Sequence, residues 1–174
     1  MLAALFVRFV DPEAARAARH LVASAADLVL VRRQHALFYA LVLAAPVEWW
    51  LGGRPAAAWQ LVGLLLAAAG VAGYRRAGRA LGDRLGPLVA PVEPARLVER
   101  GWYGRIRHPM YLAEIMLAFG LPLLLAARCT LVVSALFLVA VVRRIGVEER
   151  ALAARFPDYA AYAARTSRLL PYVY

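Results

Sequence analysis

Long apolar runs constrain the fold of this chain more than any other feature of its sequence. The four runs cover residues 34–53, 56–74, 110–127 and 130–142. The first two are close to the ~20 residues with which a helix crosses a hydrocarbon core of ~30 Å. Hydrophobic residues occupy 63% of the 174 positions, a share above that of ordinary soluble domains. The sequence therefore predicts an all-α integral membrane bundle with about four transmembrane helices.

The arginines are distributed according to these runs. All 21 basic residues are arginine, and only Arg54 and Arg128 lie in the two short turns that join the runs in pairs. Because positive residues gather on the cytoplasmic side of membrane proteins, both termini and the long connection are predicted to be cytoplasmic, at the inner membrane if the source is bacterial. The net charge of +10 then indicates a membrane partner and no nucleic acid.

The chain is predicted to form a single membrane domain over residues 1–174. Residues 1–33 form an N-terminal helix that either lies in the interface or packs on other protein, because Asp11-Pro12-Glu13 is a helix-start signal before an amphipathic stripe. Residues 34–142 form the four-span core, with a cytoplasmic loop at 75–107. Residues 143–174 form a cytoplasmic C-terminal helical segment, interrupted by Pro157.

Aromatic residues cluster near the ends of the predicted spans. Trp49, Trp50 and Trp59 flank the first short turn, as an aromatic belt would. Glu48 beside them is close enough to the interface to stay hydrated, which favours a structural role. Four tyrosines near the C-terminus are also predicted to be interfacial: Tyr159, Tyr162, Tyr172 and Tyr174.

A basic and aromatic turn leads directly into the third apolar run. Residues 101–111 read Gly-Trp-Tyr-Gly-Arg-Ile-Arg-His-Pro-Met-Tyr. Two glycines permit a tight bend, and a proline suits the first turn of a helix, so a helix is predicted to begin at His108 or Pro109. The first N–H groups of that helix would lie near Arg105, Arg107 and His108, which together favour an anionic group.

A second block follows the fourth run. Glu148 and Glu149 come after Arg143 and Arg144, and Phe-Pro-Asp-Tyr at 156–159 precedes the Arg-Leu-Leu-Pro of residues 168–171. With Arg-His-Pro-x-Tyr before it, this order resembles the isoprenylcysteine carboxyl methyltransferase family and its relatives that methylate phospholipids. The resemblance covers residues 97–171. It implies a membrane enzyme that transfers a methyl group from S-adenosylmethionine to a lipophilic acceptor, on a carboxylate, hydroxyl or amine.

The resemblance also implies site residues. The positions that match cofactor contacts are Leu97, Val98, Tyr103, His108, Pro109, Met110, Tyr111 and Glu148. Arg107, His108 and Arg144 match positions associated with catalysis, and Arg144 also matches one associated with the acceptor. Glu114 replaces the small residue often found after this tyrosine, so it is assigned to the acceptor side.

The spacing of these residues leaves alternatives open. Arg144 and Glu148 are four positions apart, so they share a helix face if the fourth run continues as a helix, whether as site residues or as an ordinary salt bridge. His108 either positions the cofactor or only caps the turn. A carboxylate acceptor needs no base near neutral pH, whereas a phenol, enol or amine would call for one from His108 or Glu114.

Two other functions compete with methyl transfer. The Gly-Trp-Tyr-Gly and Arg-His-Pro-x-Tyr sequence and the Leu-Pro-Tyr-Val-Tyr ending also resemble the C-terminal part of NADPH-dependent sterol reductases, which are much longer. A non-enzymatic scaffold with a basic cytoplasmic face is the third possibility. A metal centre is not expected, because the three histidines stand at unrelated spacings and Cys129 is the only cysteine.

Overall fold

The computed structural model describes residues 25–52, 58–81 and 97–171, and within these ranges the chain is helical. The long helices are α3 (Ala25–Gly52), α4 (Ala58–Leu81), α5 (Pro109–Leu124) and α6 (Thr130–Arg155). A short helix, α7 (Tyr159–Arg165), and a 3-10 turn, η2 (Gly101–Gly104), complete the described part. An isolated bridge between Ile106 and Ser167 is the only β-type pairing in these ranges.

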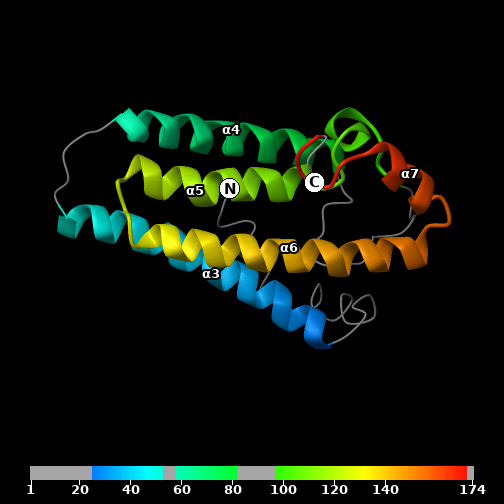
Figure 1. The fold of residues 1–174 in the computed structure, drawn as a ribbon, viewed down its shortest axis with the longest axis horizontal. Helices are drawn as coiled ribbons and strands as arrows, with labels where there is room; N and C mark the ends of the chain where they lie inside the picture. The colour runs from blue at the N-terminus through cyan, green and yellow to red at the C-terminus, as the bar shows by residue number, and fades with distance from the viewer. Residues whose placement is uncertain (1–24, 53–57, 82–96, 172–174) are drawn as a thin grey trace.

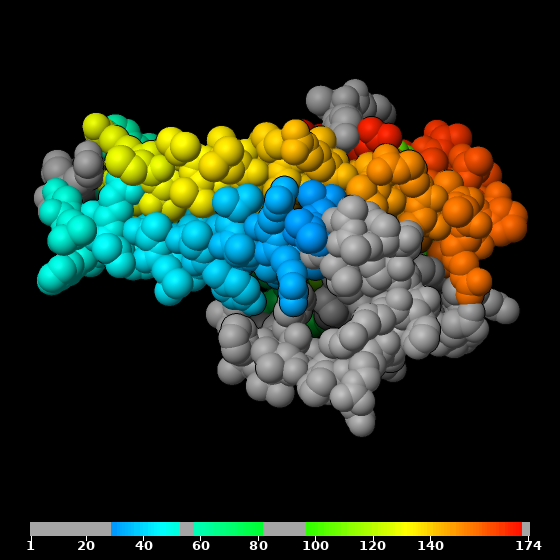
Figure 2. All heavy atoms as spheres, turned by 90° about the horizontal axis from the view of Figure 1, so that it is seen from below, coloured from blue at the N-terminus to red at the C-terminus, as the bar shows by residue number. Residues whose placement is uncertain are grey.

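The four long helices run alternately in opposite directions (Figure 1). The most extensive contact joins α4 to α5, and the next joins α3 to α6. Figure 2 shows α3 and α6 packed side by side along most of the molecule. The start of α5, the end of α6, η2 and α7 all meet at one end of the bundle (Figure 1). Segments that carry the sequence motifs are therefore neighbours in space.

Among the described residues, two helices are long and apolar enough to cross a membrane. They are the Val29–Gly52 part of α3 and the whole of α6, Thr130–Arg155. α5 is apolar but shorter. Much of the apolar surface is outward, with large exposed side chains that include Leu43, Trp50, Leu61, Leu65 and Val132. The all-helical prediction is confirmed in the described ranges, whereas the count of four spans is not.

Two helix boundaries differ from the sequence prediction, and a third agrees with it. α3 begins at Ala25, so the last part of the expected N-terminal helix is continuous with the first apolar run, because no proline or glycine interrupts residues 25–45. The preceding residues, including Asp11-Pro12-Glu13, lie outside the described ranges. α4 continues to Leu81, into the expected 75–107 loop. α6 continues past Arg143 to Arg155 and ends just before Pro157, as the breaker predicts.

Close contact between α4 and α5 depends on glycine. A Cβ atom on Gly63 would lie 2.2 Å from the backbone nitrogen of Leu124, and one on Gly120 would lie 2.5 Å from that of Ala67. A Cβ on Gly70 would lie 2.8 Å from the carbonyl oxygen of Ala113. Helix pairs in membranes commonly pack this way, because small residues let the backbones approach. The larger core residues lie between α3, α5 and α6: Leu41, Tyr111, Phe137, Val141 and Ile145.

Glu48 caps a neighbouring helix. Its carboxylate accepts hydrogen bonds from the backbone N–H groups of Cys129 and Thr130, each 2.9 Å long, and from the Thr130 hydroxyl at 2.9 Å. These donors stand at the start of α6, where backbone N–H groups lack partners within the helix. The structural role predicted for Glu48 is consistent with this geometry, and the carboxylate also suits the positive end of the α6 dipole.

Replacing Glu48 with alanine is expected to destabilise the α3–α6 pair by about 1 kcal/mol, as the loss of a helix cap does. For a chain of this size each kcal/mol lowers the Tm by about 2–4 °C. Circular dichroism during heating of the detergent-solubilised protein measures the change. Glu48→Gln retains one acceptor oxygen and is expected to lose less. A Tm equal to wild type in Glu48→Ala would contradict the capping role.

Candidate active site

The Arg-His-Pro turn is held in place by local backbone geometry. Gly101 opens η2 with φ at +62°, a left-handed conformation that favours glycine. A Cβ atom on Gly104 would lie 2.9 Å from the carbonyl oxygen of Glu99. His108 is the N-cap residue of α5, and Pro109 follows in the first turn. The predicted helix start is confirmed, and the His108 side chain is 3% exposed.

The C-terminal segment pairs with this turn. The backbone N–H groups of Arg107 and His108 donate to the carbonyl oxygens of Ser167 and Arg168, at 2.8 and 3.1 Å, and Ser167 donates back to Arg105 at 3.0 Å. The chain after α7 therefore lies along the start of α5, although about sixty residues separate the two in sequence. The two sequence blocks meet through backbone hydrogen bonds.

Arg107 ties the two segments together through its side chain. Its Nε donates to Glu149 Oε1 at 2.7 Å, and its Nη1 donates to the carbonyl oxygens of Ala163, at 2.8 Å, and of Thr166. Arg168 Nε donates to the second oxygen of Glu149 at 2.8 Å. The side chains of Arg107 and Glu149 are only 11% and 12% exposed. The predicted catalytic residue Arg107 therefore contacts the C-terminal segment and the end of α7.

His108 lies between this ion-pair cluster and the interior of the bundle. Its Nε2 is 3.5 Å from Glu149 Oε1, and its ring centroid is 5.6 Å from that of Tyr111. Since His108 and Tyr111 flank Pro109 and Met110 on the first turn of α5, all four predicted positions lie at one helix end. Leu97 and Val98 are half-buried in the segment just before η2.

Tyr111 joins the two motif blocks inside the bundle. Its hydroxyl donates to Glu148 Oε2 at 2.6 Å, and the Arg144 guanidinium carbon lies 5.3 Å from its ring centroid, in cation–π geometry. Tyr111 is 9% exposed and Arg144 is 6% exposed. Because Arg144 and Glu148 are four positions apart on α6, both side chains contact Tyr111 on α5. Arg144 is buried, unlike the partners of an ordinary surface salt bridge.

A polar network extends from Arg144 toward α3. Gln34 accepts a hydrogen bond from Arg144 Nη1 at 3.0 Å and donates one from Nε2 to Glu114 Oε2 at 2.9 Å. Gln34 is 2% exposed, and it was not among the residues that the sequence motifs indicated. The available signal was one uncharged polar residue at the start of an apolar run, which by itself is weak.

Two tyrosines expected at the membrane interface are instead buried. Tyr159 is 5% exposed and Tyr162 is 4% exposed. The Tyr162 hydroxyl donates to the carbonyl oxygen of Tyr103 at 2.7 Å, and burial raises the pKa of Tyr162 to about 12, so the donor keeps its proton. The interfacial prediction was wrong for these two, because α7 packs against α6 and Tyr162 also bonds to η2. Tyr172 and Tyr174 lie outside the described ranges.

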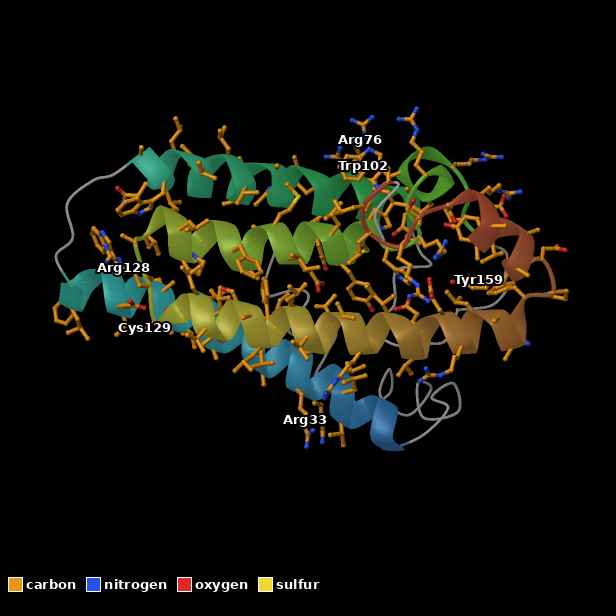
Figure 3. The ribbon with its side chains drawn as sticks, viewed as in Figure 1. Arg33, Arg76, Trp102, Arg128, Cys129 and Tyr159 are labelled. Carbon is orange, nitrogen blue, oxygen red and sulfur yellow. The ribbon has the colours of Figure 1, made fainter. Side chains whose placement is uncertain are left out.

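The opposite end of the bundle has a different character. Figure 3 shows Arg128 and Cys129 there, far from Trp102 and from Tyr159 on α7. A cavity of about 250 Å³ at that end is lined by apolar side chains and Arg128. In the described ranges, no group of three or more His, Cys, Asp or Glu side chains could hold a metal ion. The polar side chains that form a cluster therefore lie at the end of the bundle that carries the Arg-His-Pro turn.

A family model for phospholipid methyltransferase matches residues 55–158. The chain belongs to the phospholipid methyltransferase family. A comparison with curated proteins found no match. The match to the phospholipid methyltransferase family covers α4, α5 and α6, with the first motif block and the second as far as Asp158, and it includes His108, Tyr111 and Glu148. It begins after Gln34 and ends before residues 168–171. Membership, together with the apolar helices, indicates methyltransferase activity at a membrane and favours it over the reductase and scaffold alternatives.

Proposed function

We propose that this protein transfers a methyl group from S-adenosylmethionine to a lipophilic acceptor at the membrane. The observation that supports this most is the Tyr111–Glu148 hydrogen bond of 2.6 Å, with Arg144 over the same tyrosine ring and His108 beside it. This polar cluster lies at one end of a bundle whose helices are otherwise apolar, where a soluble donor and a lipid acceptor can meet.

The residues present have the chemistry that this cofactor requires. Glu148 and Tyr111 offer a carboxylate and a hydroxyl for ribose hydroxyl groups. The α5 N-terminus and His108 offer N–H donors and positive potential to a carboxylate. Tyr103, 8% exposed, and the half-buried Leu97, Val98 and Met110 offer apolar contact to an adenine ring. When bound, the cofactor supplies an electrophilic methyl group on a sulfonium, so no metal is required.

The chain's own residues then have to align the reactants and exclude water. We assign Arg144 to the acceptor, because a buried guanidinium on α6 can orient a carboxylate or a phosphate through paired N–H donors. We assign Glu114 to the same side, where it can accept a proton from a hydroxyl or an amine. His108 contacts the cofactor. Arg107 acts as a positioning residue, through Glu149 and the C-terminal segment.

A domain of this kind would take its acceptor from the bilayer. We propose one membrane domain over residues 1–174, with both termini and the site cytoplasmic, since all arginines but two lie on one side of the apolar runs.

Isoprenylcysteine-like carboxylates, phospholipid amines and long-chain phenols are the acceptor classes that match Arg144 and Glu114. Vesicles that contain each of them, incubated with methyl-tritiated S-adenosylmethionine, identify which one gains label.

Calorimetric titration with S-adenosylhomocysteine tests the donor site in detergent-solubilised protein. Wild type is expected to bind, and Glu148→Gln to bind about tenfold or more weakly, because hydrogen bonds to a charged group contribute about 1.5–3 kcal/mol. Glu99→Gln is the matched control, since the Glu99 carboxylate pairs with Arg165 and is 39% exposed. Binding of NADPH alone would favour the reductase, and folded protein that binds neither ligand would exclude both enzyme assignments.

A further inference from the structure

Gln34 occupies a position where both ends of its side-chain amide are used. The amide oxygen accepts from Arg144 on α6 at 3.0 Å, and the amide nitrogen donates to Glu114 on α5 at 2.9 Å. With Gln34 itself on α3, these two bonds connect three helices. The side chain is among the largest fully buried ones in the described ranges, at 2% exposure.

Only an amide, or a group with the same donor and acceptor, can make both bonds. Arginine is a donor only and an ionised glutamate is an acceptor only. Gln34 therefore satisfies both Arg144 and Glu114, with a donor facing the acceptor and an acceptor facing the donor. Because Gln34 is buried, loss of either hydrogen bond leaves a polar group without a partner, which is costly. The geometry assigns a defined orientation to the amide, because its flipped form would point NH2 at the guanidinium.

The network continues toward the proposed donor side. Arg144 lies over the ring of Tyr111 at 5.3 Å, and the Tyr111 hydroxyl donates to Glu148 at 2.6 Å. Glu114 and Glu148 are thus the two ends of one chain of contacts through Gln34, Arg144 and Tyr111. A displacement of Gln34 would release Arg144 from one of its fixed partners and change the environment of Tyr111.

We propose that Gln34 is a positioning residue, which ties the Arg144 guanidinium to Glu114 and thereby holds Arg144 over Tyr111 in register with Glu148. This inference rests on the proposed function, and it concerns a residue that lies outside the family match over residues 55–158. Gln34 acts through Arg144 and Tyr111. It connects the acceptor side of the site with the donor side.

Binding of S-adenosylhomocysteine to Gln34→Met tests this role. Methionine nearly preserves the volume and removes both hydrogen bonds, so affinity is expected to fall about tenfold, the size associated with a buried group that loses its partner. Gln60→Met is the matched control. Gln60 also joins two helices, by donating to the carbonyl oxygen of Leu124 at 2.9 Å, but it lies at the opposite end of the bundle, and the affinity of this variant is expected within about twofold of wild type.

A second variant, Gln34→Glu, distinguishes positioning from packing. When one proton is shared between the introduced carboxyl group and Glu114, the wild-type pattern of hydrogen bonds is reproduced. An O–H then donates between the two carboxyl groups, and an oxygen of the introduced group accepts from Arg144. Loss of that proton sets two carboxylates against each other. Affinity of Gln34→Glu is therefore expected to be near wild type at about pH 6 and to fall about tenfold by about pH 9, relative to wild type at each pH.

The titratable groups that belong to this network, or lie within electrostatic range of it, come from all four long helices. They are His35 and Tyr39 on α3, Tyr74 on α4, Tyr111 and Glu114 on α5, and Arg144 and Glu148 on α6. All of them are present in wild type as well. A pH dependence that appears only in Gln34→Glu therefore reports on the introduced carboxyl group.

The outcomes separate this inference from the proposed function. Wild type that fails to bind S-adenosylhomocysteine overturns the proposed function, and the inference with it. Wild type that binds, with Gln34→Met and Gln60→Met equally close to it, overturns the inference alone. If Gln34→Met does not fold, the Gln34→Glu series decides: an affinity ratio to wild type that is constant with pH overturns the positioning role, and the expected fall supports it.

Discussion

Replacement of Gly120 by alanine is expected to lower the stability of the α4–α5 pair by about 1–3 kcal/mol or more, the range for an overpacked contact. The new Cβ would lie 2.5 Å from the backbone nitrogen of Ala67 and 3.0 Å from the carbonyl oxygen of Gly63. Because both neighbours are helix backbone, only a separation of the two helices relieves the overlap. Heating of the detergent-solubilised protein, followed by circular dichroism, should show a Tm lower by about 2–4 °C for each kcal/mol.

Gly78→Ala is the control for this substitution. Gly78 lies on α4 as well, but no atom lies within 4 Å of a Cβ built there. Alanine favours a helix over glycine by up to about 1 kcal/mol, so this variant should melt at or above the wild-type temperature. Equal Tm values for Gly120→Ala and Gly78→Ala would show that α4 and α5 do not approach each other as described.

Replacement of Arg107 by lysine is expected to release the C-terminal segment. Lysine carries the same charge, but its single ammonium cannot reach Glu149 and the carbonyl oxygens of Ala163 and Thr166 together, as the arginine fork does. Loss of one charged hydrogen bond of about 1.5–3 kcal/mol raises the open population roughly 10- to 100-fold. Tryptic cleavage after Arg168, which tracks that population, should accelerate by a similar factor.

Arg165→Lys provides the comparison for Arg107→Lys. The Arg165 side chain is 57% exposed and pairs with an exposed Glu99, and such pairs contribute little to stability. The cleavage rate of this variant after Arg168 should stay close to wild type. If Arg107→Lys is cleaved no faster than Arg165→Lys, the segment is held by its backbone hydrogen bonds to residues 105–108, and Arg107 has a different role.

The helix ends and the helix contacts differ in how far the sequence could predict them. The start of α5 at Pro109 and the end of α6 before Pro157 follow from local signals, because glycine and proline act on the backbone of their own residues. The close approach at Gly120 does not, because its partner Ala67 lies on another helix. Nothing in either sequence segment states which faces of α4 and α5 meet.

In the candidate site, too, the sequence predicted some residues and missed others. The motifs indicated His108, Tyr111, Arg144 and Glu148, and the structure brings these four together. They did not indicate Gln34, and they assigned Arg107 to catalysis, whereas its side chain bonds to Glu149 and to the end of α7. The buried positions of Tyr159 and Tyr162 were also missed, since an interfacial tyrosine and a packed tyrosine look alike in sequence.

The sequence by itself determined the helical, membrane-type character of the chain, the main helix breaks and the chemical class of the motif residues. These properties depend on hydropathy, on backbone stereochemistry and on side-chain type, all of which are local. The tertiary structure alone decided the pairing of polar groups, such as Arg107 with Glu149 and Gln34 with Glu114. A hydrogen bond extends only about 3 Å, so its partner is chosen by how the helices pack against one another.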